Sequence, residues 1–132
     1  MRVLAMQGTV LITGSSRGLG FALAEAFLGA GFDVIATHRK DACPALEGLS
    51  QRFPGKLEIL QVDVLDEISI RQAADAVKAS RGKLDILVNN AALCLDVDDS
   101  IREADLDAIQ RQMDVNVYGP LRVTRTFLPL LE

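Results

Sequence analysis

The sequence predicts an α/β fold built on a doubly wound parallel sheet. Short apolar runs rich in β-branched residues alternate with segments whose apolar residues recur at helical spacing. A glycine-rich turn separates the first run from the first helical segment, and no repeat or linker interrupts the alternation. Parallel strands joined by right-handed crossovers give the expected strand order 3-2-1-4. The 132 residues form a single domain, residues 1–132.

Four segments are predicted to be strands because they are continuous apolar runs, as expected when a sheet is buried on both faces. They are Thr9 to Thr13, Phe32 to Thr37, Leu57 to Val62 and Leu84 to Val88.

The helical segments carry recognisable start and stop signals. They span residues 18–29, stopped by Gly29 and Gly31; Pro44 to Arg52, opened by its proline; Glu67 to Ser80, capped by Asp66 and followed by Gly82; and 101–131, interrupted around Gly119 and Pro120. The complete pattern is a Rossmann-like sheet that stops before a fifth strand.

Composition excludes several functional classes. Hydrophobic residues make up 49% and charged residues 24% of the chain, and the net charge of -4 argues against nucleic-acid binding. No apolar run is long enough for a membrane helix, and the N-terminus does not resemble a signal peptide, so we expect a cytoplasmic protein. Cys43 and Cys94 lack metal-ligand spacing and are expected to be reduced structural residues.

The turn after the first predicted strand has the pattern expected of a phosphate site. It runs Thr13-Gly14-Ser15-Ser16-Arg17-Gly18-Leu19-Gly20. Glycines let the backbone approach a pyrophosphate, and free N–H groups at the helix start face its negative charge. We expect a branched side chain at Gly14 to fill the pyrophosphate space while leaving the fold largely intact. The alternative is a tight glycine turn that binds no ligand.

The spacing TGxxxGxG resembles the short-chain dehydrogenase/reductase family. Asp63-Val64 after the third strand, Asn89-Asn90-Ala91-Ala92 after the fourth, and Asn116 within VNVYGP agree with that family in the right order. The resemblance covers residues 7–132. The segments ITGSSRGLG, VIATHR and LPLLE resemble its C-factor-like branch.

The resemblance implies a dinucleotide cofactor and a set of residues that bind it. Those residues are Gly14, Ser15, Ser16, Arg17, Gly18, Leu19, Gly20, His38, Arg39, Asp63, Val64, Asn90, Ala91, Ala92 and Val115. In the family the aspartate contacts the adenine amino group. Ala92 departs from the family, which has glycine there, and its Cβ is expected to crowd the ribose side.

The catalytic part of the family pattern is incomplete in this chain. The family uses Asn, Ser, Tyr and Lys, with the last two in a YxxxK motif. Asn116 matches the asparagine, but the single tyrosine, Tyr118, comes too early and is followed four residues on by Arg122. We expect Tyr118 to be a core or interface residue. The chain therefore resembles the cofactor-binding, N-terminal half of a longer reductase, and it is expected to be inactive alone.

The residues after the second strand favour NADP over NAD. An acidic residue there commonly binds the ribose 2′-OH of NAD, but this chain has His38 and Arg39, and Asp41 comes only later. A guanidinium suits a 2′-phosphate, and Arg17 supplies a second one nearby. The alternative is that both arginines are solvated loop residues.

The last helical segment predicts a kink and an apolar stripe. Pro120 has no N–H, so the carbonyl of Asn116 loses its helical partner, and Gly119 eases the distortion. In the family this asparagine belongs to a proton relay; the alternative is a packing kink. The stripe comprises Leu106, Ile109, Met113, Val117, Leu121, Leu128 and Leu131. Such a stripe is more often core than interface, although the family pairs this helix across a two-fold axis.

Two functions remain open at this point. The first is an NADP-dependent oxidoreductase acting on a small carbonyl or alcohol, and the second is a non-catalytic dinucleotide-binding or interaction module. A homo-oligomer is expected in either case, through the stripe or through the open edge of the fourth strand.

Overall fold

The computed structural model describes residues 7–95 and 100–132 and contains a four-stranded parallel sheet. The strands are β1 (Thr9–Ile12), β2 (Asp33–His38), β3 (Leu57–Gln61) and β4 (Ile86–Val88), in the order β3-β2-β1-β4. This confirms the predicted fold class and strand order. Strand β4 starts two residues later than predicted because the Leu84 N–H donates to the Leu130 carbonyl (2.7 Å) instead of joining the sheet.

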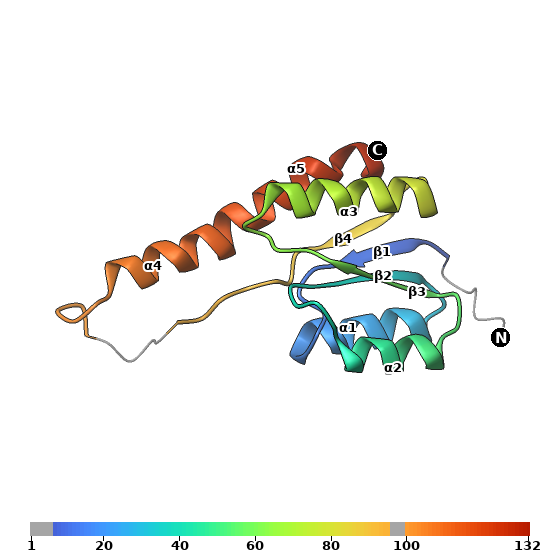
Figure 1. The fold of residues 1–132 in the computed structure, drawn as a ribbon, viewed down its shortest axis with the longest axis horizontal. Coiled ribbons are helices and arrows are strands. Elements are labelled where there is room, and N and C mark those ends of the chain that lie inside the picture. Colours follow the sequence, from blue (N-terminus) through green and yellow to red (C-terminus); the bar gives the residue numbers. More distant parts are fainter. Residues whose placement is uncertain (1–6, 96–99) are drawn as a thin grey trace.

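Three helices have the predicted bounds. They are α1 (Gly18–Gly29), α2 (Pro44–Arg52) and α3 (Glu67–Ser80). Asp66 caps α3 as expected, since its carboxylate accepts a hydrogen bond from the Ile68 N–H at 2.9 Å. Helices α1 and α2 cover one face of the sheet, while α3 and α5 (Gly119–Leu131) cover the other (Figure 1).

The sheet separates two apolar cores, because successive strand residues point to opposite faces. Val10 and Ile12 of β1 pack under α1 and α2, whereas Leu11 between them packs under α3 and α5. The parallel register places Val34 beside Val10 and Ile35 beside Leu11, so both cores continue across β2. All of these side chains are buried, which fixes the register of the strand ends that form the site.

The last helical segment begins later than predicted and contains a π-helical turn. Helix α4 covers Leu106–Met113, the π-turn η1 covers Asp114–Tyr118, and α5 follows directly. The start is set by Asp105, whose carboxylate accepts from two N–H groups of the first turn. The Gly119 N–H donates to the carbonyl of Asp114, five residues back, so the irregular turn lies before Gly119.

Gly119 is needed for close packing of this helix on the sheet side. A Cβ there would lie 2.9 Å from Cγ2 of Val64, in the loop after β3. Pro120 occupies the first turn of α5, where a missing N–H costs little. The helical segment therefore packs against the loop after β3 at Gly119, directly after η1, while α4 projects beyond the sheet (Figure 1).

The prediction that the apolar stripe is core is wrong. Val115, Val123 and Phe127 are the buried side chains of this helical segment. Six of the stripe residues are exposed, with Leu106 at 76% and Leu121 at 61%, and those of α4 lie on a helix that projects past the sheet. The exposed members are Leu106, Ile109, Met113, Val117, Leu121 and Leu128.

The cysteine prediction holds for one residue only. Cys43 is buried beside α2, but Cys94 is exposed in the loop after β4; both are free thiols. Among the residues that the structure describes, no helix is long and apolar enough to cross a membrane.

Candidate functional site

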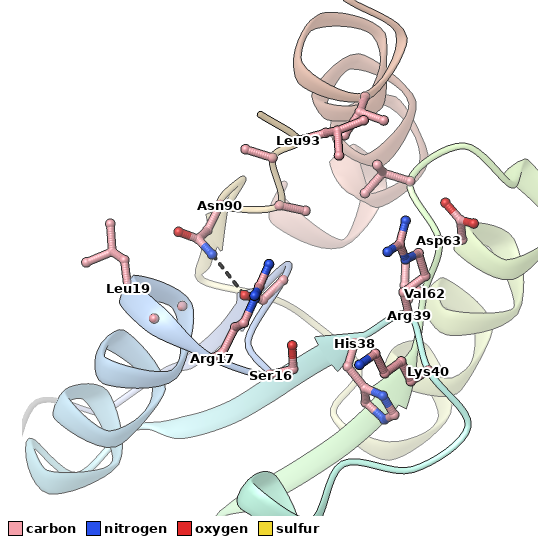
Figure 2. A pocket seen from close by; sticks show the side chains of 17 residues that line it. Ser16, Arg17, Leu19, His38, Arg39, Lys40, Val62, Asp63, Asn90 and Leu93 are labelled. Carbon is pink, nitrogen blue, oxygen red and sulfur yellow. Dashed lines mark hydrogen bonds between the residues drawn. The ribbon is translucent and has the colours of Figure 1, made fainter. Parts of the chain in front are cut away.

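A cleft of about 480 Å³ lies at the carboxyl ends of the strands, where α/β sheets commonly bind ligands. Figure 2 shows its walls, which come from the turn after β1, the end of β2, the end of β3 and the loop after β4. Of the residues predicted to bind a cofactor, all but Ser15 line it. The structure adds Lys40, Val62 and Leu93 to that set.

Gly14 and Gly20 line the cleft and also allow the glycine turn and the loop after β4 to lie in contact. Gly14 has a φ of 66°, and a Cβ there would lie 2.8 Å from Cα of Ala91. A Cβ on Gly20 would collide with the Gly14 carbonyl and the Asn90 amide. The expectation that a branched side chain at Gly14 leaves the fold largely intact is therefore wrong, because the missing side chain is what lets the loop after β4 approach.

Gly18 is the glycine of this turn that leaves open space. Its φ is 58°, and a Cβ would meet no atom within 4 Å. It opens helix α1, whose N-cap residue Arg17 makes no side-chain capping hydrogen bond, and the first turn carries no acidic residue. The first N–H groups of α1 thus remain available to an anion.

Ser15 holds the glycine turn to the sheet, on the side away from the cleft. Its buried hydroxyl donates to the Ile12 carbonyl at 2.7 Å, and its N–H donates to the Thr37 carbonyl at 2.8 Å. The residue therefore ties the turn to β1 and β2, and its side chain does not reach the cleft. Ser15 is therefore the one residue of the predicted cofactor-binding set that does not line the cleft, because sequence spacing does not show which side of a turn a hydroxyl faces.

Thr13 and Asn90 join the glycine turn to the loop after β4. The Thr13 hydroxyl accepts hydrogen bonds from the N–H groups of Asn90 and Ala91, both at 3.0 Å. The Asn90 side-chain amide donates to the carbonyls of Thr13 (3.1 Å) and Gly14 (3.0 Å). One of these bonds is visible in Figure 2. This end of the cleft is held by neutral, partly buried hydrogen bonds.

Two positive side chains, those of Arg39 and Lys40, follow strand β2 at the other end of the cleft (Figure 2). Arg17, Arg39 and Lys40 are exposed and line the cleft, and their charged groups have no hydrogen-bonding partner within residues 7–95 and 100–132. His38 closes strand β2 and is 6% exposed, with an Nδ1 atom that lacks a partner. Lys40 could have been found in the sequence, since it follows Arg39 directly.

Asp63 is the acidic residue among those lining the cleft. Its Oδ1 accepts a hydrogen bond from the Leu65 N–H at 2.9 Å, which orients the carboxylate beside Val64. Asp63 follows β3 rather than β2. The lining residues at the end of β2 therefore include no carboxylate.

Asn116 lies outside the lining of the cleft and binds the loop after β4. Its Oδ1 accepts from the Leu93 N–H at 2.7 Å, and its Nδ2 donates to the Leu93 carbonyl at 2.8 Å. The side-chain amide of Asn116 is therefore engaged with the backbone of this loop. That its own carbonyl lacks a helical partner remains a prediction.

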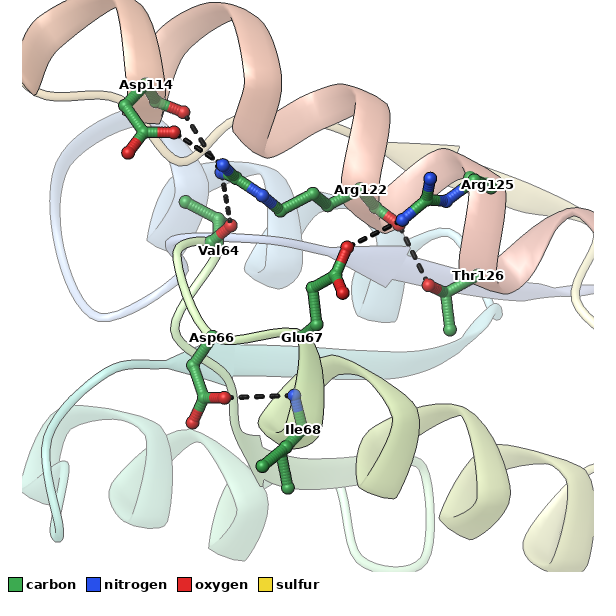
Figure 3. A network of polar contacts seen from close by, with 8 residues as sticks. All are labelled: Val64, Asp66, Glu67, Ile68, Asp114, Arg122, Arg125 and Thr126. Carbon is green, nitrogen blue, oxygen red and sulfur yellow. Dashed lines mark hydrogen bonds and ion pairs between the residues drawn. The ribbon is translucent and has the colours of Figure 1, made fainter. Parts of the chain in front are cut away.

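Arg122 and Tyr118 do not form a substitute catalytic pair. Arg122 contacts the Asp114 carboxylate at 2.6 Å and the carbonyl of Val64 at 3.4 Å, which staples η1 to the loop after β3 (Figure 3). Arg125 holds α5 to α3 through Glu67 at 2.6 Å. Tyr118 is 53% exposed and is not among the lining residues, so of the two alternatives, core or interface, the core is excluded and the interface stays a prediction.

The family model for short chain dehydrogenases matches residues 8–132. The chain belongs to this family. A short chain dehydrogenase of Aspergillus terreus is 37% identical over 98% of this chain and 29% of its own length. A serine 3-dehydrogenase of Rhizobium radiobacter is 36% identical over 96% of this chain and 49% of its own length.

Solved structures of the family agree with the fold. A short-chain dehydrogenase from Streptomyces avermitilis has a TM-score of 0.83 and 35% identity, covering 96% of this chain and 45% of that one. A Shigella flexneri member complexed with NADP has a TM-score of 0.85 and 25% identity, covering 94% and 53%. The chain thus spans about half the length of these relatives, or less.

Proposed function

We propose that the cleft binds NADP(H), and that a chain as long as its relatives transfers a hydride between this cofactor and a small carbonyl or alcohol. The observation that carries the proposal is the charge distribution of the cleft. Arg39 and Lys40 follow β2, Arg17 lies in the glycine turn, and no lining carboxylate follows β2 to reject a 2′-phosphate. The family membership and the NADP complex of the Shigella flexneri relative support it.

The residues of the cleft fit the parts of this cofactor. The open space at Gly18 and the uncapped start of α1 suit the pyrophosphate. Asp63 and Val64 would hold the adenine, while Asn90, Ala91 and Ala92 would lie along the nicotinamide ribose. When bound, the nicotinamide supplies or accepts the hydride.

We infer that the chain alone does not turn over substrate. Hydride transfer to a carbonyl leaves an alkoxide, and a positioned acid is worth typically about 10²–10⁴-fold in rate. Tyr118 lies away from the cleft lining, and Arg122 is engaged with Asp114. Neither residue is placed to donate the proton.

Calorimetric titration of the chain with NADPH and with NADH tests cofactor binding. We expect NADPH to bind at least about 10-fold more tightly, the effect of one hydrogen-bonded charge pair. Equal affinity, or tighter binding of NADH, contradicts the assignment of the cation end to a 2′-phosphate.

NADPH oxidation with a panel of aldehydes and ketones tests inactivity. We expect no consumption above the rate without protein. Turnover that is lost in Asn116→Ala would show that this half is catalytically competent, and it would replace the inference above. If NADPH binds but even a chain extended to the length of its relatives never turns over, the alternative of a non-catalytic nucleotide-binding module is favoured.

We also propose that the chain self-associates. The exposed apolar stripe on α4 and α5 lies near the unpaired edge of β4, and both leave apolar surface or backbone groups open to a partner. The homo-oligomer would bury one or both surfaces.

A further inference from the structure

Two amide side chains of the long helix bind the loop after β4 in the same way. Asn116 pairs with both backbone groups of Leu93, as described above. One turn earlier, Gln112 accepts a hydrogen bond at its Oε1 from the Leu95 N–H at 3.1 Å, and its Nε2 lies 3.5 Å from the carbonyl of Ala108 in its own helix. The side chain is partly buried, with its oxygen directed to the loop.

The spacing of these contacts has a geometric reason. Residues four apart on a helix are separated by about 6 Å along its axis. Residues two apart on an extended chain are separated by about 6.6 Å, and their N–H groups point the same way. The hydrogen bonds pair Gln112 with Leu95 and Asn116 with Leu93, so the two helix side chains contact the loop in antiparallel order.

We propose that Gln112 is a positioning residue that fixes the wall of the cleft formed by the loop after β4. Leu93 is the link, because it lines the cleft (Figure 2) and its backbone is bound by Asn116. With Asn116 alone, the loop would be fixed at one residue and could pivot about it. The second contact at Leu95 removes that freedom and holds the wall at Ala92 and Leu93. The ligand part of this inference rests on the proposed NADP(H) site.

The test compares two substitutions at one position. Gln112→Met keeps the shape of the side chain but removes its acceptor, whereas Gln112→Glu keeps an oxygen acceptor for the Leu95 N–H. Gln110→Met is the matched control, since Gln110 is exposed on the same helix. The measurements are amide hydrogen exchange at Leu93 and Leu95, amide chemical shifts at Ala92 and Leu93, and the NADPH dissociation constant.

In Gln112→Met we expect exchange at Leu95 to accelerate at least about 10-fold, as expected for an amide without its partner. The shifts of Ala92 and Leu93 should move, and NADPH should bind about 2- to 12-fold more weakly, the equivalent of one hydrogen bond. Gln112→Glu should restore all of these to near the wild-type values, and Gln110→Met should leave them unchanged.

Unchanged exchange at Leu95 in Gln112→Met, or the same changes in Gln110→Met, would overturn the proposal. Faster exchange at Leu95 with unmoved Ala92 and Leu93 shifts would also overturn it, because the wall would then not depend on Gln112. If the wild-type chain fails to bind NADPH, the proposed function fails, while the exchange and shift data still decide the role of Gln112.

Discussion

The two ends of the cleft differ in whether the residues that line them also hold the fold together. At the cation end, Arg39 and Lys40 are exposed side chains whose charged groups take no part in holding the backbone. At the other end, Thr13 and Asn90 bind backbone groups, and the structure has no room for side chains at Gly14 and Gly20. The first end can therefore change its ligand preference without affecting folding. The second cannot, because the contacts that shape it also hold β1 to β4.

Gly14→Val should have the largest effect, because it tests the end where site and fold coincide. The positive φ costs an L-residue about 1–2 kcal/mol, and the added carbon would also push into the Ala91 backbone. We expect a loss of more than about 3 kcal/mol in unfolding free energy, or failure to fold. Urea denaturation followed by circular dichroism measures it.

Gly18→Ala is the control for this prediction. Gly18 has a similar positive φ but open space around the added carbon. The loss of unfolding free energy should therefore be about 1–2 kcal/mol, while NADPH affinity falls. If Gly14→Val is as stable as Gly18→Ala, the close contact with the loop after β4 is not structurally important.

Much of the fold follows from local signals in the sequence. Helices α1, α2 and α3 have the predicted bounds because Gly31, Pro44 and Asp66 act at their ends through nearby backbone alone. The strand order follows from general rules of parallel connections. The residues of the glycine turn and of the loops after β3 and β4 were predicted to meet, and the cleft confirms it.

The errors concern long-range contacts. Nothing near Gly14 in the sequence reveals Ala91, and nothing near Asn116 reveals Leu93, yet these partners decide what the two residues do. The apolar stripe was predicted to be core because periodicity records which residues share a helix face, but not whether that face meets the sheet. Lys40 was missed although the signal was present.

Arg39→Asp tests the other end of the comparison. The substitution removes a cation from the proposed 2′-phosphate site and adds a carboxylate that can accept from a ribose hydroxyl. We expect NADPH affinity to fall about 10- to 100-fold, so that NADH becomes the tighter ligand, with the unfolding free energy within about 0.5 kcal/mol of wild type. Calorimetry and urea denaturation provide the two measurements.

The matched control is Arg71→Asp, which makes the same charge change at an exposed position of α3 outside the cleft lining. It should leave the cofactor preference intact. A similar loss of NADPH affinity in both variants would mean that net charge alone is responsible. A large loss of stability in Arg39→Asp would break the distinction between the two ends.

The apolar stripe is like the cation end in one respect: most of its side chains are exposed, so they can be changed with little effect on folding. Leu121→Glu places a charge in the stripe, while Ile86→Lys places one on edge strand β4. If the stripe is the contact, Leu121→Glu should weaken self-association at least about 10-fold and Ile86→Lys should not, by light scattering. A wild-type monomer at tens of micromolar contradicts the proposed association.

The smallest expected effect concerns strand β4, which is held to β1 differently at its two ends. Near the cleft the contacts of Thr13 and Asn90 are neutral. At the far end the Asp85 carboxylate accepts from the Thr9 N–H at 2.8 Å and lies 3.1 Å from the Lys83 ammonium. The Thr9 N–H first, and Lys83 second, hold the pKa of Asp85 below its ordinary value of 3.8.

Because the pKa of Asp85 is lower in the folded state, the ionised carboxylate stabilises the protein at pH values above its ordinary pKa. This stabilisation is lost as the pH falls through the folded-state pKa. Asp85→Asn should therefore be slightly less stable than wild type at pH 7, and the two should converge below pH 3.8. In the wild type, lowering the pH should accelerate amide exchange at Thr9, after correction for intrinsic rates, but not at Asn90 or Ala91. Equal acceleration at both ends would show that β4 opens as one unit, and the contrast between a charged end and a neutral end would then have no consequence for its stability.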